Sequence, residues 1–73
     1  MRQVKSIRDL QVGTPVQLKT WESTKRDKVV VYNGIVSHRT GNLYVEIYYS
    51  DGERITYCHD HIDDILLYIV EVK

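Results

Sequence analysis

Residues 43–57 have the sequence LYVEIYYSDGERITY, and this stretch decides the fold. From Leu43 to Tyr49 every second residue is apolar, which is the period of a β-strand with one buried face. Asp51 and Gly52 follow, and an Asp-Gly pair between two alternating runs is a strong signal for a hairpin turn. The second run, from Arg54 to His59, is expected to return as the partner strand. The stretch therefore predicts an antiparallel β-hairpin.

The same logic extends to both sides of this hairpin. Residues 29–39 form the strongest strand, with apolar residues on both faces, and Gly34 within it suggests a bulge or bend where a side chain would obstruct a close backbone. Residues 16–21 alternate as a half-buried strand, and residues 66–72 are the expected last strand. Residues 22–28 are charged and polar, and we expect a mobile loop there.

Composition supports an all-β chain. The 73 residues include ten Val, seven Ile and five Thr but no Ala, and β-branched residues favour strands whereas Ala favours helices. The longest apolar run, residues 65–70, is far shorter than the roughly 20 residues of a membrane-spanning helix. The first ten residues are charged and lack the apolar core of a signal peptide. A single cysteine excludes an internal disulfide, so we expect a cytoplasmic protein.

The predicted elements add up to one small domain. Residues 1–11 are a lead-in segment, which we expect to be an extra strand, a small helix or an arm that orders on binding. Residues 12–73 supply five short strands, with one 3₁₀ turn, capped by Asp60, before the last strand. Five such strands bury one face and remove their edges by curling into a small, partly open barrel.

Short motifs along residues 12–72 resemble a known family of barrels. They are Val12-Gly13-Thr14-Pro15-Val16, Tyr32-x-Gly34-x-Val36, Ile47-Tyr48-Tyr49-x-Asp51-Gly52 and Asp64-Ile65. This pattern resembles SH3-like barrels of the Tudor and KOW type. The resemblance implies the fold, and it implies binding rather than catalysis. In size and style the chain is also similar to small phage-encoded regulators that bind host enzymes, with RNA polymerase a frequent target.

Charge is distributed unevenly, although the net charge is zero. Residues 1–40 hold eight basic and three acidic residues, whereas residues 41–73 hold two basic and seven acidic residues. A split of this kind predicts a dipolar surface that orients a larger protein partner, and this is the favoured function. The expected contacts are a basic group (Lys19, Lys25, Arg26, Lys28 and Arg39) and an aromatic and acidic strand face (Tyr44, Glu46 and Tyr48).

Two other binding functions remain open. Direct RNA or DNA binding would use the basic N-terminal half, although a chain with a pI of about 6.8 is less basic than most nucleic-acid-binding domains. The resemblance to Tudor domains implies an aromatic cage for methylated Lys or Arg, held by cation–π attraction. Carried over by position, the cage would comprise Trp21, Tyr32, Tyr49, Asp51 and Tyr57. The sequence leaves the oligomeric state open.

The segment Cys58-His59-Asp60-His61 carries side chains that are able to bind a metal or to act in catalysis. His59 and His61 share a face if they lie on a strand, and Cys58 or Asp63 could add a zinc ligand. Structural zinc sites usually combine two ligand clusters that are separated in the sequence, so we expect no metal or cofactor. If a metal did bind, its ligands would be Cys58, His59 and His61. Cys58 and His59 should point to opposite faces of a strand and form no dyad. We therefore predict a protein that is not an enzyme.

Overall fold

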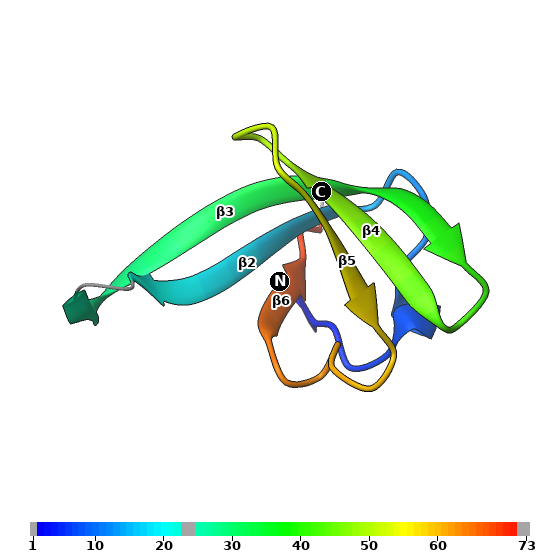
Figure 1. The fold of residues 1–73 in the computed structure, drawn as a ribbon, viewed down its shortest axis with the longest axis horizontal. Coiled ribbons are helices and arrows are strands. Elements are labelled where there is room, and N and C mark those ends of the chain that lie inside the picture. The colour runs from blue at the N-terminus through cyan, green and yellow to red at the C-terminus, as the bar shows by residue number, and fades with distance from the viewer. Residues whose placement is uncertain (1, 23–24, 72–73) are drawn as a thin grey trace.

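The computed structural model describes residues 2–22 and 25–71, with side chains described at all of these positions except 21, 22 and 25–27. The chain is all-β, as predicted, and its strands form one antiparallel sheet (Figure 1). The elements in chain order are β1 (Arg2–Gln3), the 3₁₀ helix η1 (Ile7–Asp9), β2 (Pro15–Glu22), β3 (Lys25–Thr40), β4 (Tyr44–Tyr49), β5 (Arg54–Cys58) and β6 (Leu66–Ile69).

The sheet has six strands in the order β1-β6-β2-β3-β4-β5. The predicted number of five strands is wrong, because Arg2 and Gln3 pair with Ile69 and Tyr68 and add one strand beyond β6. The sheet is not closed in the part of the chain that the structure describes, since β1 and β5 are its two edges. Figure 1 also shows that the far ends of β2 and β3 project as an arm away from the other strands.

Strand β3 is long and strongly curved. Its 16 residues would span about 50 Å if straight, at roughly 3.3 Å per residue, whereas the longest dimension of the molecule is 36 Å. The β3–β4 register shifts between Val36 and His38, which places a bulge there. Gly34 is needed for a close approach, as predicted: a Cβ at this position would lie 2.9 Å from both Ile47 Cγ2 and Tyr49 Cδ1. The bend brings the end of β4 against the middle of β3.

The predicted loop at residues 22–28 is largely strand. Trp21 pairs with Val29 and Glu22 pairs with Lys25, with a register shift between the two pairs. The β2–β3 ladder therefore continues beyond the apolar part of both strands, because backbone hydrogen bonding does not require apolar side chains. Residues 23 and 24 lie outside the described residues.

The lead-in segment packs into the core of the sheet. Val4, Ile7 and Leu10 are fully buried, and the Val4 N–H donates to the Leu67 carbonyl at 2.8 Å. Ser6 begins η1 with a capping box, accepting from the Arg8 N–H while the Asp9 carboxylate accepts from the Ser6 N–H. Of the three predicted forms, a short strand and a small helix are both present. The remaining buried side chains come from the sheet and from the turn before β6: Val16, Val36, Val45, Ile47, Tyr49, Ile62, Leu67 and Ile69.

The segment before β6 contains turns rather than the predicted 3₁₀ turn. His61 N–H donates to the Cys58 carbonyl and Asp64 N–H donates to the His61 carbonyl, both at 3.0 Å. These two successive turns bury Ile62, and Ile65 packs beside the core, as expected. The part of the chain that the structure describes has no helix with the length and hydrophobicity needed to cross a bilayer.

Candidate functional site: a tyrosine-lined pocket

A pocket of about 240 Å³ lies where the β2–β3 arm meets the end of β4 and the β4–β5 turn. The strand register places its walls: Leu18 pairs with Tyr32, Gly34 with Tyr49, and Ile47 with Ile55. Because Gly34 has no side chain, the Tyr49 ring can lie against β3. Its lining residues are Leu18, Tyr32, Tyr49, Asp51, Glu53 and Ile55.

Two tyrosine rings give this pocket its aromatic surface. The centroids of Tyr32 and Tyr49 are 6.3 Å apart with an interplanar angle of 69°, which is an edge-to-face pair. Tyr49 is only 2% exposed and belongs to the core, so it contributes a floor. Tyr32 is 37% exposed and contributes a wall that solvent can reach. The pair therefore combines a fixed ring with an accessible one.

A hydroxyl–hydroxyl hydrogen bond fixes the floor. Tyr49 Oη and Tyr57 Oη are 2.7 Å apart, and this contact joins β4 to β5. Burial raises the pKa of Tyr49 far above its usual value, and the contact with Tyr57 and the charge of Asp51 raise it further. Burial also raises the pKa of Tyr57, although its hydrogen bond with Tyr49 acts in the opposite direction. Both phenols thus stay neutral across the physiological range.

Two carboxylates give the pocket a negative rim. Asp51 and Glu53 both line it, and Asp51 Oδ1 accepts from the Glu53 N–H at 3.0 Å, which holds the tight turn in place. None of the described side chains that line the pocket is a Lys or Arg. Aromatic faces and carboxylates both attract cations, so the pocket suits a positively charged group.

The structure brings together most of the predicted cage. Tyr32, Tyr49 and Asp51 line one pocket, and Tyr57 lies behind it through its bond to Tyr49. The Trp21 side chain lies outside the described residues. Sequence reasoning did not select Leu18, Glu53 and Ile55. Ile55 is two residues from Tyr57 on the same strand and therefore shares its face, which is the available signal for it, whereas no pattern points to Glu53 in the turn.

Three side chains of the predicted basic group are described, and its role in partner binding stays a prediction. Arg39 makes internal contacts: its Nε donates to the Gly41 carbonyl and its Nη1 to the Leu10 carbonyl, both at 2.7 Å, and its Nη2 contacts Asn42. Its guanidinium therefore ties η1 to the β3–β4 turn. Lys19 Nζ lies 4.8 Å from the centroid of the Tyr68 ring. Lys28 is exposed and has an interaction of its own, and the side chains of Lys25 and Arg26 lie outside the described residues.

The predicted aromatic and acidic face is the outer surface of β4. Tyr44 and Tyr48 are exposed there, and Glu46 lies between them. The Glu46 carboxylate accepts from Ser37 Oγ at 2.8 Å, and the Arg54 guanidinium lies 5.1 Å from the centroid of the Tyr48 ring. The face thus carries a positive charge as well as the predicted negative one. Its role in partner binding stays a prediction.

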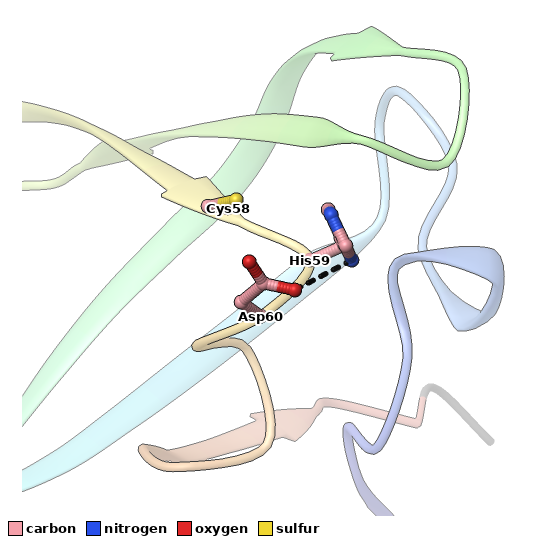
Figure 2. A group of neighbouring side chains, drawn as sticks. All are labelled: Cys58, His59 and Asp60. Carbon is pink, nitrogen blue, oxygen red and sulfur yellow. Dashed lines mark ion pairs between the residues drawn. The ribbon is translucent and has the colours of Figure 1, made fainter.

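Cys58, His59 and Asp60 form a second group of reactive side chains (Figure 2). One potential ligand atom from each residue lies within 4.8 Å of the others. The expectation that Cys58 and His59 point to opposite faces is wrong here, because β5 ends at Cys58 and the chain turns at His59. His59 Nδ1 lies 3.0 Å from Asp60 Oδ1. His61, the third residue of the predicted set, instead contacts Asp64 at 3.6 Å.

No protein-family model, curated protein or solved structure matches this chain. The function must therefore be inferred from the geometry of the site.

Proposed function

We propose that this chain is a non-enzymatic protein-binding module that holds a basic side chain of a larger protein in the tyrosine-lined pocket. The observation that carries the proposal is the combination of Tyr32, Tyr49, Asp51 and Glu53 around one cavity. A Lys or Arg side chain is long and apolar along its stem and charged at its tip. Leu18 and Ile55 would contact the stem, while the rings and carboxylates would attract the tip.

The expected free energies indicate that the contact of one basic side chain with the pocket is weak and needs a wider interface. A cation over an aromatic face contributes about 0.5–1 kcal/mol when exposed and about 2 kcal/mol when desolvated. An exposed ion pair contributes about 0–1 kcal/mol. One pocket therefore anchors a partner rather than binding it alone, and the outer surface of β4, with Tyr44 and Tyr48, would supply additional contact area.

The finer fold assignment is part of the same proposal. We assign the sheet to the SH3-like barrels of the Tudor and KOW type, supported by the return of β6 beside β2 and by the close approach of β4 to β3 at Gly34. The proposed partner is a nucleic-acid-processing enzyme in the cytoplasm, with a host RNA polymerase as the first candidate. The size of the chain and the resemblance described above support this choice.

Labelled homopeptides can test the pocket. We expect oligolysine and oligoarginine to bind and oligoglutamate of equal length not to bind, as measured by fluorescence anisotropy. Tyr32→Ala should weaken oligolysine binding about fivefold, the equivalent of roughly 1 kcal/mol. Val12→Ala is the control, because it removes an exposed apolar side chain that lies outside both the pocket and the outer surface of β4, and it should leave the affinity unchanged. Equal weakening by both variants would contradict the proposal.

Trimethyl-lysine peptides test the methyl-lysine reader alternative. A reader would bind trimethyl-lysine peptide more tightly than the unmodified peptide, because methylation lowers the desolvation cost of the cation. Two tyrosines are described in this pocket, and we expect no preference for the methylated form. A marked preference would replace our proposal with the reader.

Direct nucleic-acid binding is tested by a gel-shift assay at several salt concentrations. The account predicts no shift at moderate ionic strength, together with retention of a protein partner in a pull-down. A salt-sensitive shift that is lost when Lys25, Arg26 and Lys28 are changed to Glu would support nucleic-acid binding instead.

A further inference from the structure

We infer that Cys58, His59 and Asp60 form a three-ligand site for a divalent transition metal ion of borderline softness, with Zn²⁺ the best match. The donor atoms are a thiolate sulfur, an imidazole nitrogen and a carboxylate oxygen, which is the ligand chemistry of zinc sites. The site lies at the other end of β5 from the tyrosine-lined pocket, so this inference does not depend on the proposed function.

The backbone explains how three consecutive residues come to face one another. Cys58 is the last residue of β5 and pairs with Tyr44, so its side chain projects from a backbone position that the β4–β5 pairing holds in place. The His59 N–H then donates to the Leu43 carbonyl at 2.8 Å, and the His61 N–H donates to the Cys58 carbonyl at 3.0 Å. These bonds define a turn at which the strand alternation stops. Figure 2 shows the three side chains around that turn.

The distances are close to those of a metal polyhedron. Bonds of about 2.0–2.1 Å to nitrogen and oxygen place two tetrahedral ligands about 3.3 Å apart, and a bond of about 2.3 Å to sulfur increases the separation to about 3.6 Å. His59 Nδ1 and Asp60 Oδ1 are 3.0 Å apart, and all three donor atoms lie within 4.8 Å of one another. A movement of the exposed His59 and Asp60 side chains by about 1 Å toward the half-buried Cys58 would therefore complete the triangle.

The chemistry of binding is a replacement of protons by the metal. The Cys58 thiol gives its proton to solvent, and the proton that His59 Nδ1 directs at Asp60 Oδ1 in the metal-free chain moves to Nε2 or to solvent, so that Nδ1 of a neutral imidazole coordinates. His59 and Asp60 are about half or more exposed, with side-chain exposures of 49% and 66%, so the ion needs no buried entry path. Three protein ligands leave the fourth tetrahedral position for water or for a group of a partner.

Cobalt substitution tests the site directly, because Co²⁺ bound to a thiolate has a near-ultraviolet charge-transfer band. The full chain, purified without a histidine tag and kept reduced, is titrated with Co²⁺ and then with Zn²⁺. We expect one Co²⁺ per chain, a charge-transfer band, and loss of the band when Zn²⁺ is added. Cys58→Ser should abolish the band, and His59→Ala and Asp60→Asn should each weaken binding at least about tenfold.

His61→Ala is the matched control, because His61 is two residues away and contacts Asp64 instead. It should leave the affinity for Co²⁺ unchanged, and circular dichroism checks that each variant keeps its strands. Absence of the band would overturn the inference. So would equal affinity in His59→Ala and the parent protein, which would mean that the thiolate binds alone. A stoichiometry of one ion per two chains would also overturn it, because the ligands would then come from two molecules.

Discussion

Gly34 is the residue on which the shape of the pocket depends most directly. A Cβ at this position would meet two side chains and also the Tyr48 carbonyl oxygen, a backbone atom 3.0 Å away. We predict that Gly34→Ala lowers the free energy of unfolding by about 1–3 kcal/mol through overpacking. Urea denaturation measures this loss, with His38→Ala, on the same strand and exposed, as a control within about 0.5 kcal/mol of the parent. Equal stability of the two variants would contradict the role of Gly34.

The Tyr49–Tyr57 pair makes a prediction about alkaline pH. Both pKa values are raised above their usual value near 10 in the folded chain. The unfolded chain therefore loses these protons first, so the contribution of the pair is complete below about pH 10 and is lost as the pH rises above it. The variant with Tyr49→Phe and Tyr57→Phe should lose less stability between pH 9 and pH 11 than the parent, as measured by urea midpoints. Identical losses would contradict this account.

Arg39 shows why single residues are hard to assign from sequence. We expected it to contact a partner because it is one of the basic residues of the first half of the chain. Its fork of donors instead contacts the Leu10 and Gly41 carbonyls. These two oxygens belong to chain segments about 30 residues apart. No pattern in the sequence indicates that these two segments lie close together in the fold.

At the scale of elements, the lead-in segment contributes more than its two-residue strand suggests. Val4, Ile7 and Leu10 are fully buried, and a buried aliphatic side chain contributes about 1.5–3 kcal/mol. The three together are comparable to the whole stability of a small domain, about 5–15 kcal/mol. We predict that deletion of residues 1–10 unfolds the chain, as seen in its amide NMR spectrum, whereas Val12→Ala, at a position 64% exposed, leaves the spectrum folded. A folded deletion variant would contradict the prediction.

The elements also show which sequence signals are reliable. Strands β4 and β5 were predicted because their period of two and the Asp51-Gly52 turn agree with each other. Strand β1 could be expected only as one of three forms of the lead-in segment, because two residues contain no period and its pairing depends on β6 at the other end of the chain. The strand at residues 25–28 was predicted as a loop because these residues are all charged. The backbone pairing of β2 with β3 nevertheless reaches Lys25. Ser6 and Asp9 form a capping box, and their spacing of three residues is a signal for it in the sequence.

At the scale of the whole molecule, folding rearranges the charge split of the sequence. Five of the seven acidic residues of the second half lie in the turns at the two ends of β5: Asp51 and Glu53 lie in the β4–β5 turn, and Asp60, Asp63 and Asp64 lie in the turns before β6. Among the basic residues of the first half, Arg39 makes internal hydrogen bonds. The uneven charge distribution could therefore be read from the sequence. Only the fold shows where the charges collect, and the best-defined collection is the negatively charged pocket.

The central claim is that the tyrosine-lined pocket binds a basic side chain. Its most direct test is amide NMR of the labelled full chain during titration with oligolysine. The account predicts shift changes centred on Tyr32, Tyr49, Asp51, Glu53 and Ile55, with the outer surface of β4 less affected. Changes confined to Tyr44, Glu46 and Tyr48, or the same changes with oligoglutamate, would contradict it.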